Sequence, residues 1–169
     1  EKLRIDSSGR LLLGTTTEGS GNADNLTVAD SGHSGITIRS GTSSHGSIYF
    51  SDATSGGGEY DGYIEYEQAN RRLNLGTAGN TRLRIDSSGR VLIGGSSART
   101  NFNNGSASPQ IQIENVLNGN KSSVALIHNE NNTGDSSSLH FAKTRGGTVG
   151  DDSALNQAGD RLGQIVFSG

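Results

Sequence analysis

Three carboxylates in the middle of the chain, Asp61, Glu65 and Glu67, have the side-chain types and spacing that acid–base chemistry needs. Two carboxyl groups that face one sugar linkage can hydrolyse it, one as the acid and the other as base or nucleophile. The glutamates alternate, however, with Ile64 and Tyr66, as polar residues do on the solvent face of a β-strand. We favour that structural interpretation and expect no enzymatic activity.

The tyrosines are a second group with the chemistry to contact a ligand. All four lie within 18 residues, at Tyr49, Tyr60, Tyr63 and Tyr66. Aromatic rings stack on the apolar faces of sugars, which makes the group a candidate carbohydrate contact. Aromatic residues on neighbouring strands also pair across a hairpin and stabilise it. We favour this second interpretation.

No residue pattern predicts a metal, phosphate or other cofactor site. Asp151-Asp152 lacks the spaced oxygen ligands of a calcium loop, and Gly56–Gly58 is followed by neither the lysine nor the helix of a phosphate cradle. The histidines fall in or beside turns or on short strands, and none forms a His-x-His step. They are His33, His45, His128 and His140. We therefore expect no catalytic residues, no metal and no cofactor.

The chain is organised around a sequence of twelve residues that occurs twice. It runs from Leu3 to Gly14 and returns 80 residues later from Leu83 to Gly94, with ten of the twelve positions identical. Such similarity indicates a chain built from repeated units. Each copy reads as a strand, the turn Asp-Ser-Ser-Gly and an aliphatic strand. In that turn an aspartate bonds the backbone two residues on and a glycine accepts positive φ, so both copies predict a β-hairpin.

Further short strands are expected between and after the hairpins, and no amphipathic helix is evident. They are predicted near residues 26–28, 35–39, 46–51, 62–67, 71–76, 110–114, 123–128, 139–142 and 163–168, with hairpin strands at 2–5 and 10–14. Strands of this length and spacing indicate an all-β sandwich, barrel or fibre. We divide the chain into the end of a preceding repeat (1–14), a complete repeat (15–94) and a second, divergent and incomplete repeat (95–169). This division predicts a fragment of a longer polypeptide.

The composition is poor in the residues that build a core. Leu, Ile, Val and Phe make up about 21% of the chain, which is just above the level of disordered proteins, and 26 residues are glycine. The apolar residues are nevertheless strictly patterned, so we expect them to be buried against other copies of the chain. A net charge of −3 without a basic stripe argues against nucleic acid. The absence of cysteine excludes a disulfide framework, and no apolar run is long enough for membrane insertion.

The sequence from Arg82 to Gly94 resembles the repeat of tail-fibre and related fibrous proteins of tailed bacteriophages, especially marine phages that infect cyanobacteria. The segments 35–41, 46–52 and 159–169 are in the same style, so the resemblance covers most of the chain. It implies an extended, β-rich homotrimer located in the virion, outside the cell. The implied partners are tail or baseplate proteins and a glycan or protein of the host cell surface. Many such proteins end in a self-cleaving chaperone domain with a Ser/Lys pair, which no residue here matches.

A trimer also suits the strand pattern, because three chains around an axis can pair edges that one row of short strands leaves open. The residues expected at the axis are Ile36, Ile38, Leu73 and Leu75. Thr37 and Asn74, which alternate with them, are expected to face water. We predict a homotrimeric β-prism or triple-β-helix shaft.

The expected function is a structural segment of a trimeric bacteriophage tail fibre that extends from the virion and takes part in host attachment. One alternative is a capsid or neck fibre of the same build. Another is a fibre-borne glycan depolymerase that uses Asp61, Glu65 and Glu67 between chains. A bacterial surface adhesin is a third.

Overall fold

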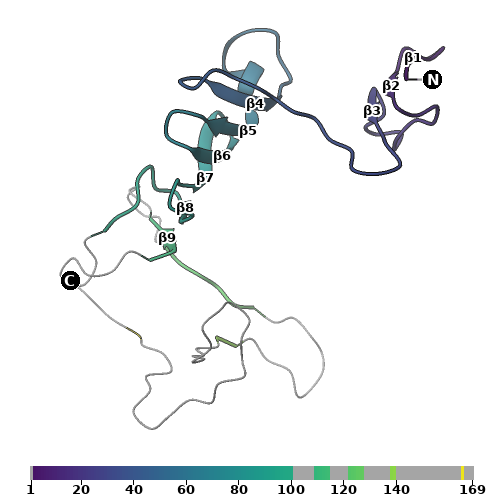
Figure 1. Ribbon diagram of the computed structural model, residues 1–169. Helices are drawn as coiled ribbons and strands as arrows, with labels where there is room; N and C mark the ends of the chain where they lie inside the picture. Colours follow the sequence, from purple (N-terminus) through teal and green to yellow (C-terminus); the bar gives the residue numbers. More distant parts are fainter. Residues whose placement is uncertain (1, 101–108, 115–121, 128–137, 140–164, 166–169) are drawn as a thin grey trace. The chain divides into compact units, whose positions relative to one another are not determined.

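The computed structural model describes residues 2–100, 109–114, 122–127, 138–139 and 165 (Figure 1). The chain groups into two compact units, Glu1–Asn80 and Thr81–Gly169, which we describe separately. In the described residues all regular structure is β-strand except for one short 3₁₀ helix, η1 (Gly56–Tyr60). The predicted all-β class is therefore confirmed. The predicted division at 14/15 and 94/95 stays a prediction.

The first repeat sequence forms the hairpin that its residues predict. Strand β1 (Leu3–Ile5) pairs antiparallel with β2 (Leu11–Leu13), and β2 then pairs in parallel with β3 (Leu26–Val28). A parallel pair needs a crossover of about a dozen residues, which the polar segment after β2 supplies. We call β1-β2-β3 the first module.

The second repeat sequence forms the same arrangement. Strand β7 (Asn80–Ile85) pairs antiparallel with β8 (Val91–Ile93), and β8 pairs in parallel with β9 (Ile111–Ile113). We call β7-β8-β9 the second module. The structural similarity of the two modules therefore extends to a third strand that lies outside the repeated twelve residues.

Between the modules in sequence lies an antiparallel meander, which we call the middle sheet. It consists of β4 (His45–Phe50), β5 (Gly62–Glu67) and β6 (Arg72–Thr77), with β5 in the centre. The tight β5–β6 turn includes Arg71 at φ +51°. The hydrogen-bonded order is β1-β2-β3 in the first module, β4-β5-β6 in the middle sheet and β7-β8-β9 in the second module.

Two of the predicted strands are wrong where the structure describes them. Residues 35–39 belong to no strand, and neither do residues 123–127, the described part of the strand predicted at 123–128. Ile38 lies against Gly46, and the amide of Gln68 donates to Ser40 Oγ, so the first segment crosses beside the middle sheet without joining its ladder. A strand exists only where a neighbouring backbone completes its hydrogen bonds. The predictions at 163–168 and most of 139–142 lie outside the described residues.

The described residues contain almost no closed apolar core. Leu12 and Leu92, at equivalent positions in the two modules, are 1% and 2% exposed and are the only buried apolar side chains among them. Most other large apolar side chains there are more than a third exposed. In the part of the chain that the structure describes, most large apolar side chains are therefore open to solvent.

Candidate functional site

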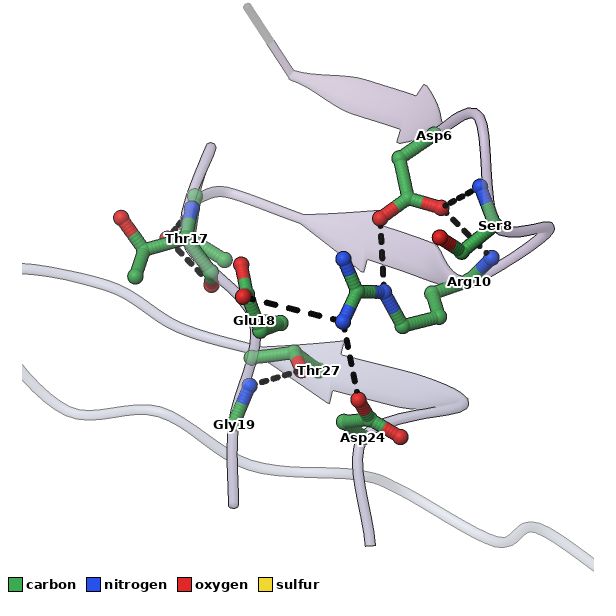
Figure 2. Close-up of polar contacts among 9 residues, drawn as sticks. Asp6, Ser8, Arg10, Thr17, Glu18, Gly19, Asp24 and Thr27 are labelled. Carbon is green, nitrogen blue, oxygen red and sulfur yellow. Dashed lines mark hydrogen bonds and ion pairs between the residues drawn. The ribbon is translucent and has the colours of Figure 1, made fainter. Parts of the chain in front are cut away.

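The hairpin turn of the first module is fixed by one aspartate and one arginine (Figure 2). Asp6 Oδ1 accepts the backbone N–H groups of Ser8 and Arg10 at 2.9 and 3.0 Å, and its Oδ2 accepts Arg10 Nε at 2.7 Å. Gly9 has φ +79°, as the turn sequence predicts. The Arg10 backbone N–H, aided by its guanidinium, holds the pKa of Asp6 below its ordinary value.

The same guanidinium reaches beyond the turn to the crossover loop. Arg10 Nη1 lies 2.9 Å from Asp24 Oδ2 and 3.7 Å from Glu18 Oε1, so one cation faces three carboxylates (Figure 2). Those hydrogen bonds raise the pKa of Arg10 further. The arginine therefore ties the hairpin to the loop that leads into β3.

The second module keeps the turn and changes the loop contact. Asp86 binds the N–H groups of Ser88 and Arg90 at 2.9 and 3.0 Å and the Arg90 Nε at 2.7 Å, the same distances as in the first module. Its loop is instead held by an ion pair between Arg99 and Glu114. The two modules thus combine a constant turn with different loop contacts.

In both modules the crossover loop is fastened to the centre of the third strand. Gly19 N–H donates to Thr27 Oγ1 at 3.0 Å, and Arg99 N–H donates to Gln112 Oε1 at 2.8 Å. Thr27 is the register partner of Leu12, so the loop lies on the face that carries this leucine. This arrangement accounts for the burial of Leu12 and, by the same pattern, of its counterpart in the second module.

The opposite face of the first module is entirely aliphatic and open. Its two cross-strand rows are Leu3, Leu13 and Val28, and Ile5, Leu11 and Leu26. Ile5 is 74% exposed and Leu3 is 59% exposed. We call this surface aliphatic face 1. No polar side chain interrupts it.

The second module repeats this face with more β-branched residues. The rows are Leu83, Ile93 and Ile113, and Ile85, Val91 and Ile111. Ile111 is 66% exposed. We call this surface aliphatic face 2. All six positions are therefore aliphatic in both modules, although two of them lie on the third strand, which follows a different crossover loop in each module.

The middle sheet also has one apolar and one polar face. The apolar face carries Ile48, Phe50, Ile64, Tyr66, Leu73 and Leu75. A hollow of about 270 Å³ on this side is lined by several of these residues together with Ile36 and Ile38. Leu75 is 36% exposed, and its predicted place at a shared axis stays a prediction.

The polar face of the middle sheet corrects one prediction. Asn74, expected to face water, is only 3% exposed, and its Nδ2 donates to Glu65 Oε1 at 3.3 Å. Glu65 Oε1 also lies 3.0 Å from His45 Nδ1, and Ser47 Oγ lies 3.5 Å from Glu65 Oε2. A buried amide is tolerated here because it is hydrogen-bonded.

The structure places two of the candidate carboxylates, Glu65 and Glu67, on the polar face of β5. Glu67 is held by Arg72 at 2.5 and 3.1 Å, and hydrogen bonds from Arg72 and then Asn70 lower its pKa to about 2. A carboxylate with that pKa stays ionised at neutral pH and is a poor proton donor. Asp61 precedes β5, where its backbone carbonyl accepts the N–H of Gly79.

The described residues contain neither a metal-binding cluster nor a membrane-spanning helix. No group of three or more His, Cys, Asp or Glu side chains there is placed to hold a metal ion, and no helix there is long and apolar enough to span a membrane. His33 lies in an irregular exposed segment, and His45 lies on β4. His128, His140 and Asp151-Asp152 lie outside the described residues.

Comparison with known proteins gives no assignment. No protein-family model matches the chain, and no curated protein matches it. The interpretation of these surfaces therefore depends on their own chemistry.

Sequence reasoning missed the residues that hold the modules together. These are Arg10 and Arg90 in the turns, Thr27 and Gln112 under the loops, and Gly14 and Gly94 after the second strands. The arginine and glycine have a visible signal, because both are kept in the two copies of the repeat. The equivalent position is Thr27 in the first module and Gln112 in the second. Only the structure therefore shows that both side chains accept a hydrogen bond from the crossover loop.

Proposed function

We propose that this chain is a structural segment of a homotrimeric bacteriophage tail fibre that extends from the virion and takes part in host attachment. The observation that carries the proposal is the pair of open aliphatic faces on two copies of one module. Six aliphatic side chains line each face, and no polar side chain lies among them. Monomeric soluble proteins rarely leave contiguous apolar patches of more than a few hundred Å² exposed.

Other copies of the same chain are the simplest cover for these faces. Each copy carries the same surfaces, so a rotation axis brings equivalent faces together, as in most homo-oligomers. Stable interfaces bury about 800 Å² per partner, and they are apolar at their centre. The segment from Arg82 to Gly94 resembles the repeats of phage fibre proteins. This resemblance supports an assembly of three copies in the form of a fibre.

The alternation of constant and variable parts supports a role in attachment. The hairpin turns match atom for atom, whereas the loops that follow β2 and β8 differ in length and in the ion pairs that hold them. Loops on a rigid frame are where binding residues concentrate. Several identical loop sets on one fibre would strengthen weak contacts through effective concentration.

Electron microscopy of phage particles tests this proposal. Antibodies against the chain, detected with gold on virions of the phage that encodes it, should label fibres at the tail. Purified chain added in excess should slow adsorption of these virions to host cells. Gold at the neck or on the capsid would favour the capsid or neck fibre, and unlabelled virions would contradict the proposal.

A further inference from the structure

Three tyrosines form a continuous aromatic patch on the polar face of the middle sheet. Tyr49 and Tyr63 are register partners on β4 and β5, so their side chains lie on the same face. The ring centroids of Tyr49 and Tyr60 are 6.4 Å apart with the planes tilted by 55°. Tyr49 is 53% exposed and Tyr60 is 47% exposed. The patch therefore presents ring surface to solvent.

A glycine fixes the orientation of the third ring. Gly76 is the register partner of Tyr63 on β6, and a Cβ at this glycine would overlap the Tyr63 ring atoms. The Tyr63 ring therefore lies against the Gly76 backbone, and the residue as a whole is half-buried. Glycine weakens a strand interior, and a close approach of this kind is a usual reason for its presence.

Hydrogen-bonding side chains lie in the next cross-strand row. Ser47, Glu65 and Asn74 share the face with the tyrosines and occupy the adjacent row of the register. Glu65 is held by contacts to His45 and Asn74, so its oxygens are fixed in position before any ligand arrives. Fixed polar groups beside an apolar surface are the usual composition of a small-molecule site.

The arginine on this face is already engaged by a carboxylate. Glu67 is paired with Arg72, and Glu65 lies 3.0 Å from the imidazole of His45. A phosphate, sulfate or carboxylate would meet paired carboxylates and find no spare cation among these residues. An uncharged ligand with hydroxyl groups is not repelled by the carboxylates and needs no cation. A pyranose ring also has an apolar C–H face that can stack on a tyrosine ring.

We propose that the patch formed by Tyr49, Tyr60 and Tyr63 binds a neutral saccharide. One sugar ring stacks on the tyrosines, and its hydroxyl groups bond to Glu65 and Ser47 at the edge of the patch. The inference deepens the proposed role in host attachment and rests on it for the source of the saccharide, which would be a cell-surface glycan. The binding chemistry itself depends only on this face of the sheet.

Saturation-transfer NMR on the full chain tests the site. The probes are neutral di- to tetrasaccharides of glucose, galactose, mannose and N-acetylglucosamine, with sialyllactose and a sulfated disaccharide as charged probes. A neutral probe should receive saturation at the C–H protons of one ring face. The double variant Tyr49→Leu/Tyr60→Leu should bind it about tenfold more weakly, because two stacking rings are lost.

Two further variants separate this site from general damage. Tyr66→Leu removes a tyrosine from the opposite face of β5 and should leave binding unchanged. Gly76→Ala keeps every tyrosine but displaces the Tyr63 ring, and it should weaken binding while far-UV circular dichroism retains the β signal. Equal losses in Tyr66→Leu and the double variant would overturn the proposal.

The remaining outcomes are also decisive. Binding of charged probes alone, or of no saccharide at millimolar concentration by a folded sample, would overturn the inference. The mass of the same sample, measured by light scattering, keeps the two proposals apart. A monomer that binds a neutral saccharide would support this site and contradict the trimer, whereas a trimer that binds none would do the reverse.

Discussion

Each module contains two glycines with positive φ that have different surroundings. Gly9 at +79° has open space where a side chain would project. Gly14 at +77° has none, because a Cβ there would overlap the carbonyl oxygen of Ala29, the residue after β3. Gly89 and Gly94 repeat this difference in the second module. Gly9 and Gly89 are therefore required for their backbone conformation alone. Gly14 and Gly94 are required both for their conformation and because the neighbouring backbone leaves no room for a side chain.

Alanine substitutions should separate these two effects. Gly9→Ala should lower the free energy of unfolding by about 1 kcal/mol, the usual effect of a left-handed conformation at alanine. Gly14→Ala should add the cost of overpacking, about 1–3 kcal/mol more. Urea unfolding at one fixed protein concentration measures both variants. Equal losses would contradict the packing of the loop end against β3.

The pair formed by Glu67 and Arg72 should make stability depend on acid pH. The pKa of Glu67 falls from 4.5 to about 2 on folding, so the ionised form is favoured in the folded state. Its contribution is complete above pH 4.5 and is lost as the pH falls towards 2. Glu67→Gln should lose less stability than the natural chain over this interval in urea titrations. Parallel losses in both proteins would show that Arg72 does not hold this carboxylate.

At the level of elements, the module places adjacent leucines in opposite environments. Leu12 is 1% exposed under the crossover loop, whereas Leu11 and Leu13 point to aliphatic face 1 and are 37% and 43% exposed. The same aliphatic run thus supplies both the small core of the module and its open face. These two uses predict different consequences of truncation.

Leu12→Ala should destabilise the module itself, by about 2–5 kcal/mol for a buried leucine. Hydrogen-exchange mass spectrometry should then show faster exchange in β1 and β2. Leu11→Ala should leave that protection nearly intact and weaken association between copies, seen as a lower mass at low concentration. If Leu11→Ala speeds exchange in β1 and β2 while Leu12→Ala only weakens association, then Leu12 is not the covered residue and Leu11 is not on the open face.

Much of the fold follows from local sequence. The two hairpins, their Asp-Ser-Ser-Gly turns and strand β5 at residues 62–67 are where alternation and turn residues predict them. Alternation also assigns side chains to faces correctly. It cannot say which face is covered, and for that reason Asn74 was assigned to water although it is buried beside Glu65.

The remaining differences come from contacts distant in sequence. The segment at 35–39 has strand-like residues but lies beside Gly46 without a ladder partner in the described part of the chain. The parallel pairing of β3 and β9 depends on loops of different length, which no local pattern specifies. Likewise, the Arg10 contacts to Asp24 and Glu18 arise only when the crossover loop returns to the hairpin.

At the scale of the whole molecule, we propose that other copies of the chain cover the aliphatic faces. Charges placed on both faces should therefore dissociate the assembly. The double variant Leu13→Asp/Ile93→Asp places one aspartate in each aliphatic face, at equivalent positions of the two modules. The two natural residues are 43% and 39% exposed. Burying two unpaired carboxylates is strongly unfavourable, so this variant should sediment as a β-rich monomer.

A matched control adds the same charge elsewhere. Ser31→Asp with Ser87→Asp places two carboxylates at exposed turn positions away from the aliphatic faces. This variant should keep the mass of the natural chain in analytical ultracentrifugation. Dissociation of both variants would point to charge repulsion in general rather than to the faces.

The most direct test is the mass of the natural chain in solution, measured by light scattering with far-UV circular dichroism on the same sample. We predict a β-rich species with three times the mass of one chain, stable on dilution into the low micromolar range. A folded, β-rich monomer with its aliphatic faces open to water would contradict the account.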